Sequence, residues 1–407
     1  MMFAADPMLS GQVGLAVFLI VCLKVLVSFA FLMVATMFMV WFERKVIAGM
    51  QNRVGPNKAG PFGLLQTLAD GIKLFFKEDL IPEQADSFVF KLAPFLSLVP
   101  AFLIFTAIPV GGDFNNKAHP GQISMFGHWT TLQLADPPIG ILLVLALSSI
   151  AVYGIMLAGW ASGSKYPLLG SVRASAQMVS YEAALGLSVL AVVLVTGALQ
   201  TSGIVKAQDT ILRWNLVATA FVPFIVFVIA ATAELNRPPF DLVEAEQELV
   251  GGFNTEYSSI RFALFFLAEF MNTITMSAII VTLFLGGPQP PFAFLRNIPG
   301  PQWLYGVVWF FAKLFLFLFM YVWFRATLPR VRYDQLMDLG WKLLIPVALA
   351  WLLLLASLQL AQSKGWNFQR KAALVAADLI VFGISAALLL RAQSVSAKRR
   401  ELEGSAF

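Results

Sequence analysis

Nine apolar stretches, each long enough to cross a lipid bilayer, constrain this chain more than any other feature of its sequence. A helix needs about 17 to 25 mostly apolar residues to span the hydrocarbon core. Only 13% of the residues are charged, against roughly 25% in soluble domains, so a soluble fold is excluded. The stretches lie near residues 15–42, 92–110, 138–160, 182–200, 214–233, 262–286, 303–325, 342–361 and 372–391. We expect an all-α fold, a polytopic transmembrane helix bundle of about nine spans with amphipathic helices in its cytoplasmic loops.

Lysine and arginine concentrate on one side of the expected bundle. With the N-terminus placed outside, the inside segments hold 19 basic residues and the outside segments 7, while Lys24 and Lys313 fall within spans. Because basic residues accumulate in cytoplasmic loops, we predict an outside N-terminus and a cytoplasmic C-terminus in a bacterial inner (cell) membrane. Residues 1–392 then form a single integral-membrane domain and residues 393–407 a basic cytoplasmic tail.

Several kinds of site have no residues to build them. The one cysteine, Cys22, lies in the first apolar stretch, and the two histidines, His119 and His128, share one loop. Iron-sulfur clusters, haem and zinc sites need more cysteine or histidine than this, and the sequence has no glycine-rich nucleotide-binding motif. The formal charge of +5 reflects topology rather than nucleic-acid binding. We therefore expect no cofactor bound by this chain itself and no nucleic acid as a partner.

The segment 43–91 between the first two spans is too apolar to be a free linker. Gly55-Pro56 and Gly60-Pro61 predict turns. Apolar residues then recur at helical spacing, namely Leu64, Leu65, Leu68, Ile72 and Phe75. Asp70 and Lys73 fall on other faces of the same helix. The pattern predicts an amphipathic helix on the membrane surface, and the plainer interpretation is an amphipathic anchor without a further role.

Polar side chains lead from the segment 161–181 into the fourth span. Arg173, Gln177 and Tyr181 recur at helical spacing and can share one face, which continues into Glu182 at the start of the apolar stretch. Such a face indicates a hydrated path into the membrane. The alternative is ordinary capping and anchoring at the membrane interface.

The segment 234–261 is acidic, although basic residues dominate the other segments expected in the cytoplasm. Its carboxylates are Glu234, Asp241, Glu244, Glu246, Glu248 and Glu256, against Arg237 and Arg261. Pro238-Pro239 after Asn236 predict the start of a helix. On that helix Asp241, Glu244 and Glu248 fall within about a 60° arc. The sequence thus predicts a carboxylate face or, in the plainer interpretation, a solvated acidic loop.

Glu269 lies deep inside the sixth span. An ionised side chain at the bilayer centre costs at least about 2.5–3.5 kcal/mol, so such residues usually face protein or water and often carry function. We interpret Glu269 as a functional group or, alternatively, as the structural partner of an intramembrane lysine such as Lys313. Lys24 can snorkel along its helix, and Asp378 lies near enough to the outer end of its span to reach water.

Three segments together resemble one family. They read ERKVIAGMQNRVGPNKAGPFGLLQTLADGIKLFFKE, GWASGSKYPLLGSVRASAQMVSYE and AELNRPPFDLVEAEQELVGGFNTEYSSIRFALFFLAEF. They closely resemble the H subunit of the proton-pumping NADH-quinone oxidoreductase, respiratory complex I, called the first NADH dehydrogenase subunit in mitochondria. The likeness covers about Glu43 to Arg332. It departs at Tyr166-Pro167-Leu168, where the family more often has alanine or serine in the middle, and in the ninth span, which exceeds the commonest eight-helix form.

The resemblance implies which residues serve quinone binding and proton transfer. In the family this subunit seats the peripheral arm and forms the entrance and floor of the quinone chamber, which here implicates segments 43–91, 161–181 and 234–261. The matching quinone-binding positions are Glu43, Arg44, Arg53, Asp70, Lys73, Arg173, Gln177 and Arg237. The matching acidic proton relay consists of Glu182, Glu234, Asp241, Glu244, Glu246, Glu248, Glu256 and Glu269.

The resemblance also implies partners and cofactors. The partners are other complex I subunits, namely the peripheral-arm subunits of the quinone site and the neighbouring small membrane subunits, together with phospholipid. Quinone is the substrate, and flavin and iron-sulfur clusters belong to partner subunits. The residues agree with this role, because quinone reduction takes up two protons and the chain offers apolar walls with clustered carboxylates, which titrate as a coupled set.

Two other functions stay open from the sequence. A related membrane subunit of a ferredoxin-, hydrogenase- or coenzyme-linked complex would keep the architecture and change the partner. A stand-alone ion transporter would use the intramembrane carboxylates as its substrate site. The sequence shows no internal repeat, which weighs against the transporters built from inverted repeats.

Overall fold

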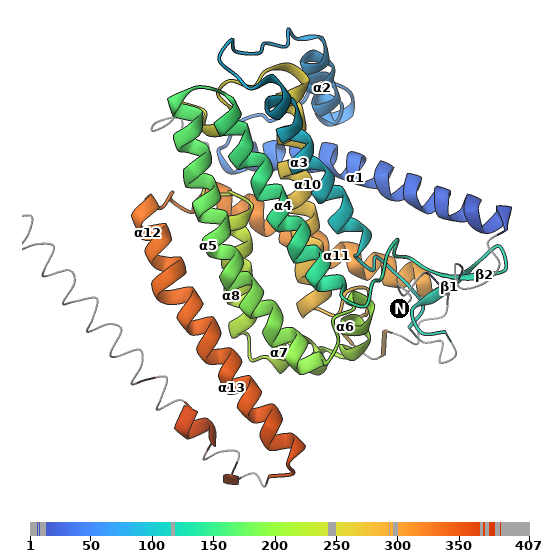
Figure 1. The fold of residues 1–407 in the computed structure, drawn as a ribbon. Helices are drawn as coiled ribbons and strands as arrows, with labels where there is room; N and C mark the ends of the chain where they lie inside the picture. The colour runs from blue at the N-terminus through green and yellow to red at the C-terminus, as the bar shows by residue number, and fades with distance from the viewer. Residues whose placement is uncertain are drawn as a thin grey trace, which may run out of the picture.

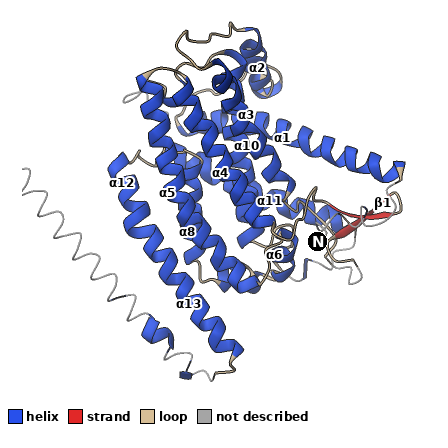
Figure 2. Ribbon diagram, viewed as in Figure 1, coloured by secondary structure: helices blue, strands red, loops and turns tan. Residues whose placement is uncertain are grey.

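The computed structural model describes residues 14–114, 119–242, 250–292 and 300–366, with shorter pieces at residues 6, 8, 294–295, 369–370, 374–378 and 383. This part of the chain is a bundle of helices with one short two-stranded hairpin (Figure 1; Figure 2). The all-α fold predicted from the apolar stretches is confirmed.

Seven helical stretches among the described residues are long and apolar enough to cross a membrane. They are α1 (Leu15–Met50), α3 (Ser87–Thr106), α4 (Gly140–Ala161), α5 (Lys165–Thr196), α10 (Ser259–Phe284), α11 (Gln302–Thr327) and Tyr333–Ser363, which joins α12 (Tyr333–Asp338), the π-helical turn η6 (Leu339–Leu344) and α13 (Ile345–Ser363). The chain is a multi-pass membrane protein. Most of the expected ninth span, 372–391, and the whole tail, 393–407, lie outside the described residues.

The expected fifth span, 214–233, is interrupted. A short helix, α7 (Asn215–Ala218), is followed by residues with positive φ angles, 54° at Ala220 and 65° at Phe221. The next helix, α8 (Val222–Glu234), has 13 residues, or about 20 Å at 1.5 Å per residue, which is short of the roughly 30 Å hydrocarbon core. Hydropathy averages over such a break, so the sequence shows one apolar run where the chain forms two helices.

Two spanning helices extend beyond their apolar stretches. Helix α1 continues through Glu43 and Arg44 to Met50, and α5 begins at Lys165, so that most of the expected loop 161–181 is helical. Polar residues at a helix end still form backbone hydrogen bonds, and their side chains reach toward water. The length of the apolar stretch in the sequence therefore underestimates the length of the helix. As a result, several polar side chains of the expected site are held on rigid helices.

Helix α10 forms the centre of the bundle, since every residue from Thr273 to Phe284 is buried. Helix α3 packs against α4 and α10, α4 packs against α5, and α5 packs against α8 and α13. The close approach of α4 to α3 depends on Gly154, where a Cβ would lie 2.7 Å from the backbone nitrogen of Ser97 and 3.0 Å from the carbonyl oxygen of Ala93. Helix α1 differs, because its N-terminal half projects from the bundle (Figure 1).

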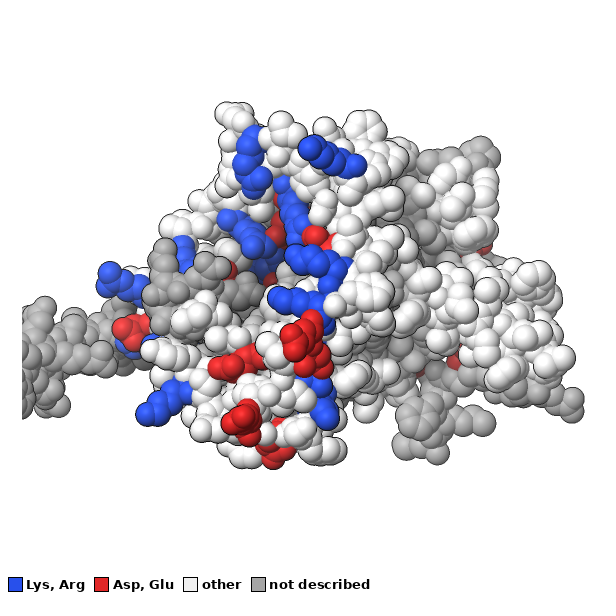
Figure 3. Space-filling view, turned by 90° about the horizontal axis from the view of Figure 1, so that it is seen from above, with Lys and Arg blue, Asp and Glu red and all other residues white. Residues whose placement is uncertain are grey.

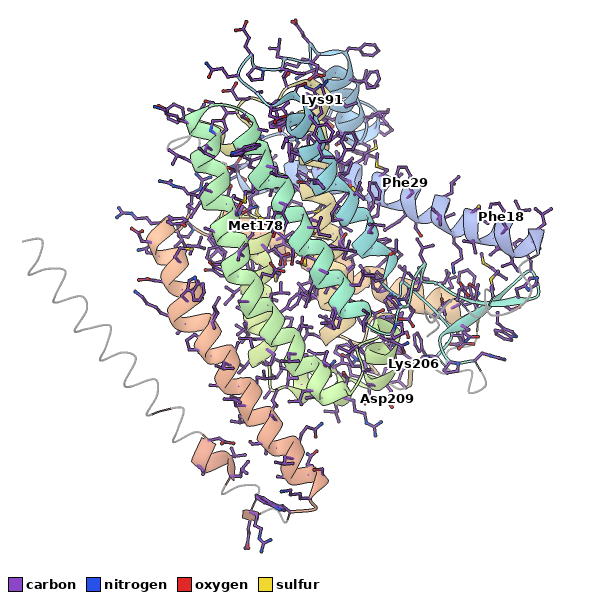
Figure 4. The ribbon with its side chains drawn as sticks, viewed as in Figure 1. Phe18, Phe29, Lys91, Met178, Lys206 and Asp209 are labelled. Atoms are coloured by element: carbon purple, nitrogen blue, oxygen red, sulfur yellow. The ribbon has the colours of Figure 1, made fainter. Side chains whose placement is uncertain are left out.

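The two ends of the bundle carry different short elements (Figure 1). One end, called the α2 end below, carries η2 (Pro61–Gly63), α2 (Gln66–Phe76) and η4 (Gly252–Asn254). The opposite end, called the α6 end, carries α6 (Thr201–Ala207), η3 (Ile211–Arg213) and α7. In Figure 4, Lys91 marks the α2 end and Lys206 the α6 end. The strands β1 (Gln122–Met125) and β2 (His128–Thr131) form a hairpin beside the N-terminal half of α1.

The amphipathic helix predicted after residue 64 is confirmed as α2. Its apolar residues Leu68, Ile72 and Phe75 are exposed, and the helix has no buried residue. The turn before it needs glycine at Gly63, which has a φ of 80° and where a Cβ would lie 2.4 Å from the backbone of Pro56. That α2 lies on a membrane surface stays a prediction.

Candidate functional site

Arg237 joins three segments that are far apart in the sequence. It follows α8, and its side chain is only 4% exposed. Its Nη1 lies 2.8 Å from Oε2 of Glu43 on α1, and its Nε lies 3.1 Å from Oε1 of Glu269 on α10. The guanidinium also lies 4.3 Å from the ring centroid of Phe270. Arg237 is therefore a buried cation shared between two carboxylates and an aromatic face.

Glu43 has a second arginine partner. Nη1 of Arg325, near the end of α11, donates a hydrogen bond to Oε1 of Glu43, while Oε2 accepts from Arg237. The charges alternate in the order Arg325, Glu43, Arg237, Glu269. Arg237 and Glu43 are buried, whereas the side chains of Arg325 and Glu269 are 39% and 27% exposed. A buried charge is tolerated when it is paired, so Arg237 and Glu43 depend on their neighbours in this charge chain.

The segment after Arg237 is not the helix start that Pro238-Pro239 predict. Residues 237–242 form a turn and an irregular stretch, and the backbone changes direction at Asn236, whose φ is +51°. Phe240 is buried, and the carbonyl oxygen of Pro239 accepts a hydrogen bond from the backbone of Val331 at 3.0 Å. These tertiary contacts outweigh the local preference of the proline pair for a first helical turn.

Asp241 is buried rather than solvated. Its side chain is 8% exposed, and its Oδ2 lies 3.1 Å from Nη2 of Arg330. The solvated acidic loop therefore does not describe Asp241. The other carboxylates of the expected face, Glu244, Glu246 and Glu248, lie outside the described residues.

The predicted polar face of α5 holds neighbouring segments in place. Nε2 of Gln177 donates to the carbonyl oxygens of Ala233 at 2.7 Å and Phe240 at 2.9 Å. The hydroxyl of Tyr181 donates to the carbonyl oxygen of Leu336 at 2.8 Å, and the guanidinium of Arg173 lies 5.8 Å from the ring centroid of Tyr333. Gln177 thereby fixes the turn that carries Arg237. The hydrated path expected along this face stays a prediction.

Two further carboxylates lie between α4, α5 and α8. Glu234, the last residue of α8, is buried and lies near Ser148 of α4, whose hydroxyl donates to the carbonyl oxygen of Leu145 at 2.9 Å. Glu182 of α5 accepts a hydrogen bond from Ser149 and lies close enough to Glu234 for the two carboxyl groups to interact electrostatically. The structure therefore brings together Glu182 and Glu234, two of the eight carboxylates of the expected relay.

A cavity of about 70 Å³ connects Glu234 with Glu269. Its polar lining comes from α3, α8 and the turn after it, η4 and α10, and consists of Ser97, Glu234, Asn236, Asn254, Glu269 and Asn272. Within the described part of the chain, Oγ of Ser97, Oε2 of Glu234 and Oδ1 of Asn254 are buried without a hydrogen-bond partner. Buried polar atoms of this kind are usually satisfied by ordered water, which needs roughly 10–15 Å³ per molecule. The cavity is therefore large enough and polar enough for several waters.

The remaining part of the acidic segment packs at the α2 end. The ring of Tyr257 stacks on Phe90 with centroids 4.0 Å apart, and its hydroxyl donates to the carbonyl oxygen of Phe90 at 3.1 Å. Burial raises the pKa of this hydroxyl above its ordinary value, against the opposing effect of Arg261. Glu256 lines a separate open hollow of about 620 Å³ with Lys165, and it is not among the residues that line the cavity of Glu234 and Glu269.

Comparison with known proteins identifies the family. The family model described as NADH dehydrogenase matches residues 23–356. A protein of Frankia alni, named as the H subunit of NADH-quinone oxidoreductase, is 55% identical over 362 residues, which cover 88% of this chain and 76% of that protein. Proteins of the same name from Frankia casuarinae and Streptomyces avermitilis are 53% and 48% identical, covering 88% and 89% of this chain and 75% and 78% of theirs. The chain belongs to the H-subunit family of NADH-quinone oxidoreductase. The family predicted from the three segments is confirmed.

Apart from Glu43, the first-segment residues expected to bind quinone take no part in the ion pairs of the charge chain. Nη1 of Arg44 on α1 lies 2.6 Å from Oδ2 of Asp70 on α2, with side chains 44% and 33% exposed. Lys73 is exposed on α2, and Arg53 is exposed and donates to Oε1 of Gln51 at 2.6 Å. Seen from the α2 end, basic side chains surround a hollow with carboxylates deeper inside it (Figure 3). The expected quinone-binding residues thus divide into an exposed group, Arg44, Arg53, Asp70 and Lys73, and a buried group around Arg237.

Sequence reasoning missed several residues of the site in this H-subunit family member. Arg325 and Arg330 stand out in the sequence only as topology signals, and Ser97, Asn254 and Asn272 carry no charge that would single them out. The sequence signal of the two arginines is weak, because each follows an apolar stretch, where basic residues are common in any membrane protein.

The structure corrects two interpretations of intramembrane lysines. Nζ of Lys313 donates to the carbonyl oxygens of Leu285, Gly287 and Gln289 at 2.6–2.9 Å, and the ion pair that the structure gives Glu269 is with Arg237. Lys24 does not snorkel, because its side chain is buried and pairs with Asp6 and Thr130. Asp378 accepts a hydrogen bond from Ser357 at 2.6 Å.

Proposed function

We propose that this membrane subunit of NADH-quinone oxidoreductase forms the quinone chamber and its entrance with the peripheral arm. On this proposal it couples quinone reduction to proton translocation through carboxylates. The observation that carries the proposal is the double role of Glu269, which is ion-paired with Arg237 and also lines the cavity that reaches Glu234. One carboxylate thus belongs both to the buried charge chain and to the polar cavity within the bundle.

The charge chain supplies a physical means of coupling. Arg237 is shared by Glu43 and Glu269, and two unit charges about 4 Å apart interact by roughly 4 kcal/mol at an effective dielectric constant near 20. A negative charge that forms near Arg237 during quinone reduction would compete with Glu269 for the guanidinium. The proton occupancy of Glu269 then depends on the state of the quinone. Waters in the cavity would carry a proton between Glu269 and Glu234, and Glu182 continues the relay.

The exposed residues support an entrance for quinone between α1 and α2. The ion pair of Arg44 with Asp70 holds the two helices together, and the exposed apolar face of α2 suits the isoprenoid tail or phospholipid acyl chains. On this proposal Arg53 and Lys73 contact the head groups of lipid or quinone. Flavin and iron-sulfur clusters belong to partner subunits, so electrons arrive from the peripheral arm.

The proposed orientation follows from the basic residues. The α2 end faces the cytoplasm and receives the peripheral arm, the N-terminus is outside, and Glu244, Glu246, Glu248 and Glu256 belong to the acidic relay near the chamber. The relatives at 48–55% identity are named for NADH-quinone oxidoreductase, which favours NADH over ferredoxin or hydrogen as the electron source.

The variant Glu269→Gln tests the proposal in the assembled complex. We expect quinone reduction and proton pumping to fall at least tenfold, because glutamine nearly keeps the shape but can neither pair as an anion nor carry a proton. Electron transfer from NADH to a water-soluble acceptor should persist. The matched control is Asp209→Asn at the α6 end, whose carboxylate pairs with Arg213 within the same exposed segment. Full quinone reduction and pumping in an assembled Glu269→Gln complex would overturn the proposal.

A further inference from the structure

The hairpin of β1 and β2 presents an exposed aromatic tip. The strands pair antiparallel with Met125 opposite His128, and the two turn residues between them, Phe126 and Gly127, have φ angles of 50° and 84°. Positive φ at both positions is typical of the tight turns that match the twist of a hairpin. Phe126 is 84% exposed at this tip. Nothing in the proposed quinone or proton chemistry uses it.

The hairpin is fixed to the start of α1. Met125 packs against a small buried cluster of Met8, Val17 and Ile20. Deeper along the helix, Nζ of Lys24 donates to the hydroxyl of Thr130 at 3.0 Å, and that hydroxyl donates to Oδ2 of Asp6 at 2.6 Å. A two-stranded hairpin is marginally stable alone, so these contacts set its height along α1. The tip is therefore held level with the first turns of that helix.

The part of α1 beside the hairpin is exposed to whatever surrounds the bundle. Leu15, Phe18 and Leu19 are 76%, 58% and 57% exposed, although they belong to a span apolar enough to cross the membrane. Figure 4 shows Phe18 on the projecting end of α1, above the hairpin. Large exposed side chains on a spanning helix face lipid or another membrane protein, since water would be unfavourable for them.

The two faces of the hairpin differ in a way that suits a membrane interface. Successive side chains of a strand point to opposite faces, so Thr130 faces α1 and Trp129 faces away from it. Trp129 is partly exposed and stacks on His119 with ring centroids 4.4 Å apart. Aromatic rings with a polar group gather at the lipid headgroup level. Residues 122–131, QISMFGHWTT, contain no lysine, arginine, aspartate or glutamate, so no ionised side chain of these types opposes insertion of the hairpin.

We propose that this hairpin is a membrane anchor, with Phe126 and Trp129 inserted at the interface of the lipid leaflet on the hairpin's side. The exposed apolar side chains at the start of α1, a helix apolar enough to cross the membrane, lie beside a hairpin without lysine, arginine, aspartate or glutamate. Both surfaces suit lipid, which is the occupant that we propose. The anchor fixes the N-terminal end of α1, which projects from the bundle, relative to the lipid headgroups on that side. The interaction needs no anionic lipid, because the hairpin offers no lysine or arginine.

Site-specific photocrosslinking tests the anchor in the intact complex. Phe126 is replaced with p-benzoylphenylalanine, and the complex is reconstituted into phosphatidylcholine nanodiscs that contain a phosphatidylcholine with an alkyne-tagged acyl chain. Illumination should attach the tagged lipid to this chain. The same photoreactive residue at Phe18 on the exposed face of α1 sets the reference yield, and at buried Phe253 it sets the background.

The three positions separate the possible occupants of the tip. We predict a lipid yield at position 126 within about threefold of that at position 18. A crosslink from position 126 to another protein of the complex would mean that a protein partner covers the tip. A lipid yield at position 126 no higher than that at position 253 would mean that the tip lies in water. Either result would overturn the proposal, and neither bears on quinone coupling.

Discussion

At the scale of single residues, Arg237 is the side chain whose loss should disturb the most contacts. Its guanidinium lies within 3.1 Å of carboxylate oxygens from two helices, Glu43 on α1 and Glu269 on α10. Removing one partner of a buried pair leaves the other charge desolvated without compensation, which costs about 3–5 kcal/mol. An exposed pair such as Arg44 with Asp70 contributes only about 0.2–1 kcal/mol. Arg237 and Arg44 therefore make the same kind of ion pair, but the side chain of Arg237 is 4% exposed and that of Arg44 is 44% exposed.

We predict that Arg237→Ala lowers the temperature at which the purified complex loses its assembly, while Arg44→Ala leaves that temperature nearly unchanged. Arg237→Lys should fall between them, because one ammonium cannot reproduce the planar geometry that serves two carboxylates. Thermal melting followed by native gel electrophoresis measures the effect. An Arg237→Ala complex as heat-stable as Arg44→Ala would show that the buried charge chain is not a structural requirement.

The sequence named both sides of the ion pairs of Arg237, but only one side of the pair between Glu43 and Arg325. Glu269 stands out because a charge inside an apolar stretch is costly and therefore informative, whereas Glu43 and Arg237 were named through the family resemblance. The pairing of Glu43 with Arg325 was not predictable, since Arg325 is 282 residues from Glu43 and resembles any basic residue at a helix end. Composition and spacing show which side chains are unusual, and the fold decides which of them meet.

At the scale of elements, the close contact of α4 with α3 depends on Gly154 of α4, because glycine has no side chain. A Cβ at Gly154 would lie 2.7 Å from the backbone nitrogen of Ser97, and backbone cannot move aside without shifting the helix. Ser97 also lines the cavity between Glu234 and Glu269, so the same contact shapes the proposed proton path. Gly186 on α5 offers a control, because a Cβ there meets nothing within 4 Å.

We predict that Gly154→Ala destabilises the complex and reduces quinone reduction, whereas Gly186→Ala has little effect on either. Overpacking of a tight interior typically costs about 1–3 kcal/mol, which should lower the melting temperature of the membrane arm. The amount of assembled complex and its activity per assembled particle are measured separately. Equal stability and activity of the two variants would contradict the close packing of α3 on α4.

Local sequence signals predicted the elements unevenly. The long apolar spans and the amphipathic α2 follow from periodicity and length, which are local properties. The break at Ala220 and Phe221 and the irregular segment 237–242 do not, because both depend on tertiary contacts. In the second case the hydrogen bond of Gln177 to the carbonyl oxygen of Phe240 and the burial of Phe240 replace the first helical turn that the proline pair favours at residues 238–242.

At the scale of the whole molecule, polar groups connect the α2 end with the interior of the bundle. Arg325 and Arg330 meet Glu43 and Asp241, Arg237 links Glu43 to Glu269, and the cavity continues to Glu234. We propose that this sequence of groups transmits quinone chemistry from the cytoplasmic side into the membrane. Glu234 is the most informative member, because it is buried, lines the cavity and forms no ion pair among the described residues.

The most direct test of this account measures quinone reduction and proton pumping in a Glu234→Gln complex reconstituted into vesicles. Glutamine nearly keeps the volume of the side chain, but it cannot take up or release a proton at neutral pH. We predict that both activities fall at least tenfold in fully assembled complex, while electron transfer from NADH to a water-soluble acceptor continues at the wild-type rate. Wild-type quinone reduction and wild-type pumping in the assembled variant would contradict the proposed relay.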